Sequence, residues 1–331
     1  MDKNSKFHKL LTSLVEQKEI PQKLGETLEF FIDSYLEATD HDPANEAIFM
    51  QFLDLIKKEC KTPYQFEPYH KHLREPVDYH AFGKDFLRPL VVASDTSVHG
   101  KERLNEIQEH IKKGHNVVFL ANHQSEADPP LISLLLEDEY PLLSENLISV
   151  AGERVITDIL SVPFSLGCNL LCIYSKRYID HPPEKKHQKQ LHNKKTMQLM
   201  SELLKEGGKC IYVAPSGGRD RKNEKGEVVI APFDPQSIEM FYLMAKKSKT
   251  PTFFYPMALG TYDLLPPPET IQVELGERRL VGRVGVHLSV GPEIDMQHYP
   301  GSENSDKHVR RKSRADYIWN LVHDDYQKFL G

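Results

Sequence analysis

The chain has 331 residues, of which 39% are hydrophobic and 27% charged, and a formal net charge of -6. This composition supports a real core, excludes an intrinsically disordered chain, and argues against a nucleic-acid-binding protein. No apolar run approaches the roughly 18 residues that a membrane-spanning helix needs. The length predicts two domains, or one large domain with an appendage.

The N-terminal part predicts helices. Apolar residues recur at spacings of three and four over 7–17, again after Pro21, and a third time over 44–60. This pattern indicates amphipathic helices that pack as a small antiparallel bundle. The segment 63–76 is rich in proline and aromatic residues and predicts a linker. Nothing in this region has chemical character, so we expect it to be a scaffold or a platform for a partner.

From about residue 77, strands alternate with helices. The predicted strands are 116–121, 147–150, 170–174, 209–214, 253–257 and 284–290, and the predicted helices are 102–113, 128–137, 188–205 and 314–330. This alternation predicts an α/β sheet with helices on both faces.

The N-terminus and the cysteines bear on the compartment. The first eleven residues have neither the apolar core of a secretory signal nor the composition of a transit peptide. Cys60, Cys168, Cys172 and Cys210 do not form a disulfide or zinc pattern and suit a reducing compartment. We therefore expect a soluble, cytoplasmic protein, or one in the plastid stroma if the source bears plastids.

One polar stretch follows the predicted strand 116–121 and precedes a helix. It contains His123 and, five positions later, Asp128. A histidine at the carboxyl edge of a sheet can act as a general base, and a carboxylate can fix its tautomer and stabilise the imidazolium. The alternative reading makes Asp128 a helix N-cap and His123 a core histidine. No G-x-S-x-G motif accompanies the pair, so the base would act on a hydroxyl of the substrate.

A second stretch follows the predicted strand 209–214. Ser216, Gly217 and Gly218 form a turn whose backbone amides could make an anion-binding nest. Arg219 and Arg221 supply planar, permanently charged groups suited to phosphate oxygens. The alternative is a solvated turn in which Asp220 offsets its neighbours.

A third basic element, Lys176, Arg177 and Tyr178, follows the predicted strand 170–174. Three strand ends thus carry a base, a basic pair and an Arg-x-Arg. Together they predict a base-assisted transfer onto or from a small molecule that bears a phosphate.

At these residues the sequence resembles a known family. In order, it contains the blocks NHQSEADP, AGERV, NLLCIYSKR, APSGGRDR, APFDP and PMALGTYDLLPPP. These blocks are similar to those of the soluble, plastid-type glycerol-3-phosphate 1-O-acyltransferases, and homologues of this type also occur in some intracellular bacteria. The resemblance runs from about Phe82 to Val290. It implies a mixed sheet flanked by helices, with a helical bundle domain over 1–76 and a catalytic domain over 77–331.

The resemblance also implies the reaction. His123 would deprotonate the sn-1 hydroxyl of glycerol 3-phosphate, Asp128 would orient His123, and the alkoxide would attack an acyl thioester without an acyl-enzyme. Arg219 and Arg221 match the family's phosphate-binding arginines. The family has a Lys-His pair where this sequence has Arg177 and Tyr178, so Tyr178 loses a titratable group and Lys176 is the alternative to Arg177.

The implied acyl donors are acyl carrier protein first and acyl-CoA second, with no metal or organic cofactor. Because acyl carrier protein is acidic, its docking face should be basic. The candidates are Lys185, Lys186, Lys189, Lys194 and Lys195, or Arg310, Arg311, Lys312 and Arg314. We expect a monomer, with transient peripheral membrane contact when the lysophospholipid product leaves.

Two alternatives remain open from the sequence. The acceptor could be lysophosphatidate or another lipid alcohol, although related membrane-associated acyltransferases carry an anchor and a glutamate-containing phosphate motif that this sequence lacks. The chain could also be a non-catalytic module that binds a carrier protein or a phosphate.

Overall fold

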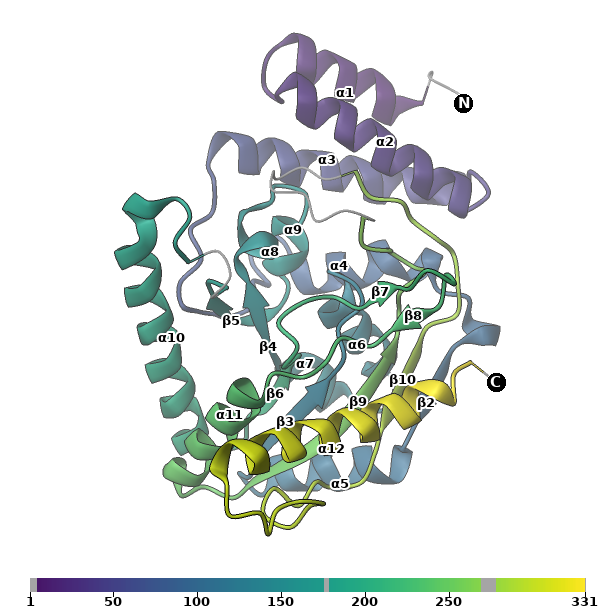
Figure 1. The fold of residues 1–331 in the computed structure, drawn as a ribbon. Helices are drawn as coiled ribbons and strands as arrows, with labels where there is room; N and C mark the ends of the chain where they lie inside the picture. The colour runs from purple at the N-terminus through teal and green to yellow at the C-terminus, as the bar shows by residue number, and fades with distance from the viewer. Residues whose placement is uncertain (1–4, 176–178, 269–277, 331) are drawn as a thin grey trace.

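The computed structural model describes residues 5–175, 179–268 and 278–330 (Figure 1). Its α-helices are α1 (Lys6–Glu16), α2 (Gln22–Ala38), α3 (Glu46–Lys61), α4 (Tyr79–Leu87), α5 (Lys101–Lys112), α6 (Asp128–Leu136), α7 (Pro141–Asn146), α8 (Glu153–Thr157), α9 (Val162–Ser165), α10 (Lys186–Glu206), α11 (Pro235–Ser248) and α12 (Lys307–Gln327). Its strands are β1 (Tyr69–His70), β2 (Ser97–His99), β3 (Asn116–Ala121), β4 (Leu147–Gly152), β5 (Asn169–Ile173), β6 (Cys210–Val213), β7 (Arg221–Lys222), β8 (Val228–Val229), β9 (Thr252–Gly260) and β10 (His287–Val290).

Within the described residues, eight strands form one mixed sheet in the order β1-β5-β4-β6-β3-β9-β10-β2. The five strands from β5 to β9 run parallel, whereas β1 is antiparallel to β5 and β10 is antiparallel to β9. The carboxyl ends of the parallel strands therefore meet at one edge, where ligand sites of α/β proteins lie. The expectation of a mixed α/β sheet is confirmed.

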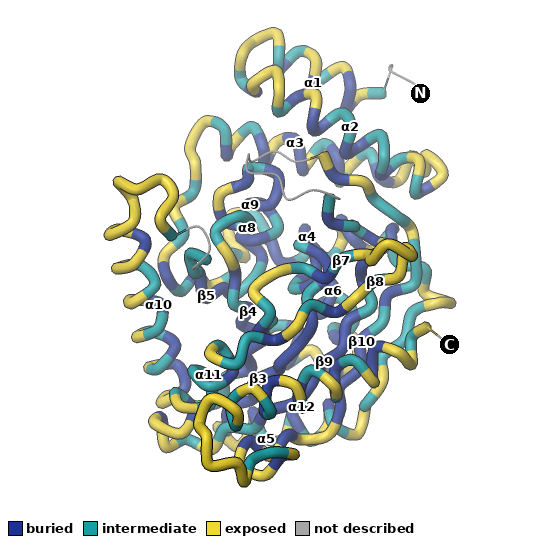
Figure 2. Tube along the Cα trace, in the orientation of Figure 1, coloured by how far each residue is buried: buried dark blue, intermediate teal, exposed yellow. Residues whose placement is uncertain are grey.

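Helices cover both faces of the sheet because successive strand residues point to opposite sides. Val117 and Phe119 of β3 pack with α5, α6 and α7. Val118 and Leu120 pack with α10, α11 and α12. Figure 2 shows the result as buried strands between helices whose outer sides are exposed.

The N-terminal helices α1, α2 and α3 form as expected and pack beyond the carboxyl edge of the sheet (Figure 1). Their aromatic residues share one hydrophobic cluster with α4, α6 and α9, which includes Phe31, Phe52, Phe82 and Leu131. The segment that predicted a linker contributes β1, which extends the sheet through pairing with β5. This strand was not predicted because it has only two residues, Tyr69 and His70, which is too short for an alternating pattern to show.

Several elements differ from the expectation. Helix α11 was not predicted, although Asp234 caps it by accepting from the backbone N–H groups of Gln236 and Ser237. Helix α12 begins at Lys307 rather than at 314, because Asp306 caps it in the same way and its first turns are charged. Strands β7 and β8 form a separate two-stranded ribbon that begins at the second arginine of the Arg-x-Arg.

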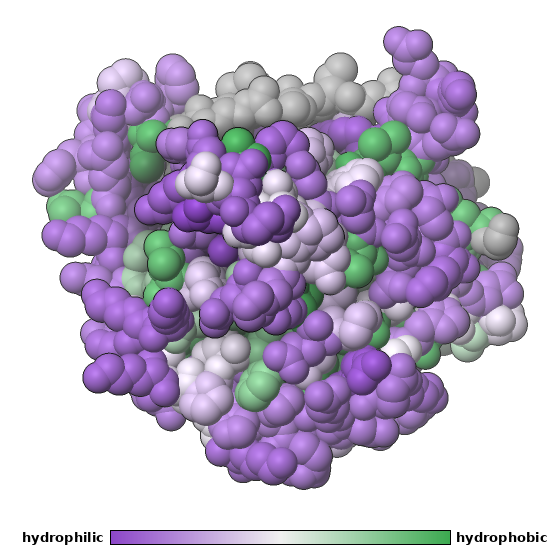
Figure 3. All heavy atoms as spheres, turned by 60° about the horizontal axis from the view of Figure 1, so that its bottom comes forward, coloured by the Kyte–Doolittle hydropathy of each residue, from purple (hydrophilic) through white to green (hydrophobic). Residues whose placement is uncertain are grey.

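The face of the molecule that Figure 3 presents is mainly hydrophilic. Figure 3 shows apolar residues in small, separate patches on the face it presents. Among the described residues we find no helix that is both long and apolar enough to cross a bilayer. All four cysteines are free.

Candidate active site

The histidine and aspartate of the first polar stretch form a pair at the carboxyl end of β3. His123 lies in the turn after β3, and Asp128 is the first residue of α6. Nδ1 of His123 and Oδ2 of Asp128 are 2.8 Å apart, the Asp128 side chain is fully buried, and the His123 side chain is 28% exposed. The pair thus has a buried carboxylate and an imidazole that a substrate can reach.

Asp128 accepts from three further donors. The backbone N–H groups of Gln124 and Ser125 donate to it at 2.9 and 3.2 Å, and Thr261 Oγ1 donates at 2.6 Å. A proton on Nδ1 of His123 completes this set of donors to the carboxylate, and Nε2 then presents its lone pair. The N-cap of α6 is Ala127, and the Asp128 carboxylate bonds to the turn before the helix. The reading of Asp128 as an N-cap is therefore wrong.

Two buried amides hold this turn against its neighbours. Asn122 donates to the Asp220 carboxylate and to the Leu259 carbonyl, both at 2.9 Å. Gln124 Oε1 accepts from the backbone N–H groups of Thr261 and Tyr262. The ends of β3 and β9 and the loop after β6 are thereby fixed to each other.

Glu126 joins the two polar stretches. Its carboxylate lies 3.3 Å from Arg219 Nη1 and 2.9 Å from Arg279 Nη2, and Arg279 also donates to Asp158 at 2.9 Å. Burial raises the pKa of Glu126, but the charges of Arg279 and Arg219 outweigh it and hold this pKa at about 2. The group is therefore a buried network of two guanidinium and two carboxylate groups.

Arg219 thus lies close to the turn that carries His123 and Asp128 (the dyad), as the convergence of strand ends predicted. Arg221 begins β7, and its Nη1 donates to the Pro268 carbonyl. Gly217 has a φ of +64°, which suits glycine, and its N–H donates to the Ala214 carbonyl within the turn. The anion nest at Ser216, Gly217 and Gly218 and the phosphate role of both arginines stay predictions.

The third basic element, Lys176, Arg177 and Tyr178, lies outside the described residues. They follow β5, whose carboxyl end shares the edge of β3, β4 and β6. Their contribution to a phosphate site also stays a prediction.

A cavity of about 120 Å³ opens beside the dyad, and most of its wall is apolar. His123, Glu126 and Arg279 supply polar groups at this wall. Its apolar wall includes Phe31, Phe86, Leu87, Leu90, Phe164, Leu264, Leu265 and Val281. A half-exposed base at the wall of an apolar cavity fits a reaction between a polar hydroxyl and a long-chain donor.

Sequence reasoning missed Arg279, Asp158, Glu126 and Thr261. Glu126 lies inside the first stretch, so its carboxylate could have been weighed beside Asp128. Arg279 follows a segment without a motif and meets Glu126 across 153 positions, and no local pattern signals such a contact.

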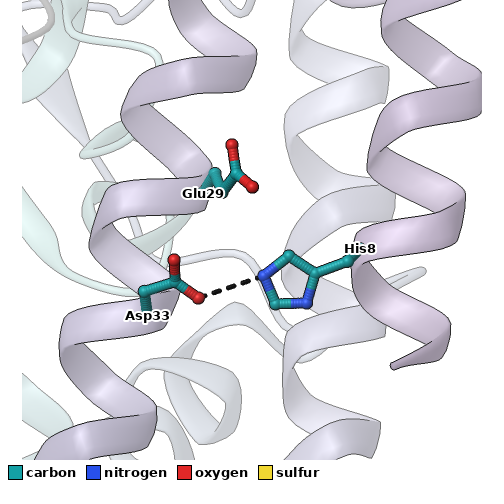
Figure 4. Close-up of side chains that lie close together, drawn as sticks. All are labelled: His8, Glu29 and Asp33. Atoms are coloured by element: carbon teal, nitrogen blue, oxygen red, sulfur yellow. Dashed lines mark hydrogen bonds and ion pairs between the residues drawn. The ribbon is translucent and has the colours of Figure 1, made fainter. Parts of the chain in front are cut away.

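One group of side chains could hold a metal ion among the described residues. His8, Glu29 and Asp33 offer ligand atoms within 4.8 Å of one another, on α1 and α2 (Figure 4). His8 already bonds to Asp33 through Nε2 at 3.0 Å and to Ser5 Oγ through Nδ1 at 2.7 Å. These bonds explain the group as a polar link between the two helices, and it does not line the cavity.

Comparisons with known proteins show which family the chain resembles. A family model described as Acyltransferase matches residues 96–260. The chloroplastic glycerol-3-phosphate acyltransferase of Arabidopsis thaliana is 42% identical over 81% of this chain and 58% of that protein. The chloroplastic glycerol-3-phosphate acyltransferase of Phaseolus vulgaris is 38% identical over 94% of this chain and 69% of that protein. The chain thus spans between 58% and 69% of the length of these relatives.

Among solved structures, the 1-acyl-sn-glycerophosphate (LPA) acyltransferase PlsC from Thermotoga maritima matches with a TM-score of 0.40 and 20% identity. The match covers 76% of this chain and 78% of that chain. This similarity is too low to bear on fold or function.

Proposed function

Because the chain belongs to the glycerol-3-phosphate acyltransferase family, we propose that it transfers an acyl chain from a thioester to the sn-1 hydroxyl of glycerol 3-phosphate. The product is 1-acyl-sn-glycerol 3-phosphate, the first intermediate of phospholipid synthesis. The observation that carries the proposal is the His123–Asp128 pair, 2.8 Å apart, at the wall of an apolar cavity.

The pair performs general-base catalysis. Nε2 of His123 takes the proton of the substrate hydroxyl as its oxygen attacks the thioester carbonyl, and Asp128 stabilises the imidazolium that forms. The tetrahedral intermediate collapses with cleavage of the C–S bond, and the imidazolium returns its proton to the leaving thiolate. Each step balances without an acyl-enzyme. Cys168 lines the cavity, but burial raises the pKa of its thiol to about 12, which makes it a poor nucleophile.

Arg219 and Arg221 are proposed to bind the acceptor's phosphate. Glu126 orients Arg219 toward the dyad turn, since both belong to the network beside His123. Binding would exchange the Glu126 and Pro268 oxygens for phosphate oxygens. Arg177, with Lys176 and Tyr178 beside it, is proposed to complete this site.

The donor is proposed to be acyl carrier protein, with acyl-CoA as a second donor. There are two candidate basic runs for its docking. In the run on α12, Arg311 and Arg314 already form ion pairs with Glu239 of the same chain, at 3.3 and 2.7 Å. On α10 and just before it, Lys185, Lys186, Lys194 and Lys195 are exposed around Leu191, which is itself 53% exposed. Lys186 and Lys195 pair with exposed carboxylates, Asp180 at 2.8 Å and Glu67 at 3.7 Å.

The buried side of α10 approaches the cavity. Lys189 is buried and pairs with Glu153 at 3.0 Å, next to Gly152 of the cavity wall. A carrier docked on α10 would therefore bring its thioester toward His123. Replacing Lys194 with Glu should raise the KM for the carrier-protein donor and leave the KM for acyl-CoA unchanged. Lys312→Glu on α12 is the matched control, and an equal effect there would reject the α10 face.

A carrier-protein donor also implies an aqueous compartment, such as the cytoplasm or the plastid stroma, which cell fractionation with an antibody to this chain tests. No metal or organic cofactor enters the proposed steps, and chelator-treated enzyme should keep its rate.

The reaction is tested by thiol release from palmitoyl and oleoyl thioesters. The acceptor is glycerol 3-phosphate, then glycerol, then lysophosphatidate, with His123→Ala as control. Turnover with glycerol 3-phosphate that the variant loses supports the proposal. Turnover with lysophosphatidate alone rejects the acceptor, and no turnover with either donor class favours a non-catalytic binding module.

A further inference from the structure

The apolar cavity reaches from the dyad to the N-terminal helices. His123 lies on its wall at the carboxyl end of β3, and Phe31 of α2 and Phe86 of α4 lie on the same wall. In Figure 1, α2 lies beyond the edge of the sheet at which β3 ends. The cavity thus extends from the catalytic edge to a helix that supplies no polar group to the site.

Phe31 and Phe86 form part of the cavity wall at this end. Their rings stack with centroids 5.9 Å apart and planes within 9°, and they are 5% and 1% exposed. Behind them, the rings of Tyr35 and Phe52 pack on the Phe86 ring, with centroids 5.0 and 5.2 Å from its centroid. Neither residue lines the cavity. Among the described residues, a dense aromatic layer therefore backs this part of the cavity wall.

Helix α2 is fixed to this layer by hydrogen bonds. Tyr35 donates to the Phe86 carbonyl at 2.7 Å, and Ser34 Oγ accepts from the Val281 backbone N–H at 2.9 Å. Val281 is itself part of the cavity wall. These bonds hold α2, and with it Phe31, against Phe86 and Val281, so the ring is packed in one position.

We propose that the stacked rings of Phe31 and Phe86 limit the acyl-chain length, so that α2 of the N-terminal bundle determines donor specificity. This inference rests on the proposed function, because it assigns the cavity to the acyl chain of the thioester. Each methylene that the cavity buries strengthens binding about fourfold, and a chain longer than the cavity must displace the aromatic layer or leave carbons outside.

The test measures kcat/KM of the full chain for acyl-CoA donors from octanoyl to stearoyl, with glycerol 3-phosphate as acceptor. Phe31→Leu and Phe31→Ala should move the optimum to a longer donor, and the ratio of long-donor to short-donor kcat/KM should rise roughly tenfold, as expected for two or so further buried methylenes. Phe31→Trp should move the optimum to a shorter donor.

Phe7→Leu is the matched control. Phe7 is 1% exposed on α1, in the same bundle, and does not line the cavity. The control should lower the melting temperature without changing the chain-length profile. An unchanged profile in the active Phe31 variants, or the same shift in Phe7→Leu, overturns the inference.

A binding measurement separates this inference from the proposed function. The rise in melting temperature that each acyl-CoA produces without acceptor should show the same dependence on chain length and on Phe31. If the wild type releases no thiol with any acceptor, the proposed function fails, whereas this binding profile still decides whether Phe31 limits the chain. Phe31→Leu serves here if Phe31→Ala does not fold.

Discussion

The carboxyl ends of β3 and β6 carry the two polar stretches and are built differently. After β3, Asp128 is fully buried and its acceptors are filled by His123, two backbone amides and Thr261. After β6, the turn at Ser216 to Gly218 is open, and Arg219 and Arg221 bond to a carboxylate and a carbonyl of the protein.

This difference has a chemical meaning. A general base must hold one tautomer and one orientation, and a preorganised pair provides both before the substrate arrives. In an anion site, an arginine can exchange the oxygens of a protein carboxylate for those of a phosphate. The buried carboxylate that the arginine leaves must then be neutralised by another group. Arg279 keeps Glu126 neutralised in this way, because it pairs with it independently of Arg219.

The largest effect on activity is expected for His123→Ala, at the carboxyl end of β3. Loss of the base should lower kcat about 10²- to 10⁴-fold and leave the KM of glycerol 3-phosphate almost unchanged. Steady-state thiol release measures both constants, and an unchanged melting temperature shows that the fold is intact. If the variant keeps more than a tenth of the wild-type kcat, His123 is not the general base.

The link between the two ends is tested by Glu126→Gln. Since the pKa of about 2 lies below the ordinary 4.5, ionised Glu126 stabilises the folded state by about 3 kcal/mol at neutral pH. This stability is fully present above about pH 4.5 and is lost as the pH falls through about 2. Urea unfolding should show the wild type more stable by about 3 kcal/mol near pH 7, with a smaller gap near pH 3.

The control for this prediction is Glu139→Gln. Glu139 is 56% exposed and pairs with Lys101 on the surface, so its replacement should change the unfolding free energy by less than about 1 kcal/mol. A gap that stays constant across the pH range in Glu126→Gln would contradict the assigned pKa.

The β6 end is tested by Arg219→Ala. Loss of charge-assisted hydrogen bonds to the phosphate should raise the KM of glycerol 3-phosphate roughly 10- to 100-fold and spare the donor KM. Lys222→Ala, in the neighbouring ribbon and 45% exposed, should leave both constants unchanged. An unchanged acceptor KM in Arg219→Ala would place the phosphate elsewhere.

The smallest effect is expected for Thr261→Val. It removes one donor to Asp128 and so loosens the orientation of His123, with a cost of about 1–2 kcal/mol, or roughly a five- to thirtyfold lower kcat. Thr157→Val, on α8 at the surface, should not change kcat. A rate that does not change in Thr261→Val would mean that the backbone donors alone position Asp128.

Much of the fold could be predicted from local pattern. The strands β3, β4, β5, β6 and β9 coincide with buried apolar runs, because a central parallel strand is apolar on both faces. Most of the missed elements are short, so their periodicity is weak. Helix α11, which has 14 residues, is the exception. The start of α12 was predicted too late because its first turns are charged. The strands β7 and β8 have only two residues each, and an alternating hydrophobic pattern cannot be recognised over so short a segment.

The His123–Asp128 pair could be proposed from local sequence, because five positions in a strand-turn-helix unit bring the two side chains together. In contrast, the contact of Asp128 with Thr261, 133 positions away, and that of Glu126 with Arg279 are set by the tertiary structure. The same holds for the place of Phe31 of α2 in the wall of the apolar cavity. These contacts depend on how strands and helices pack across the whole chain, and packing leaves no periodic signal at the residues that make them.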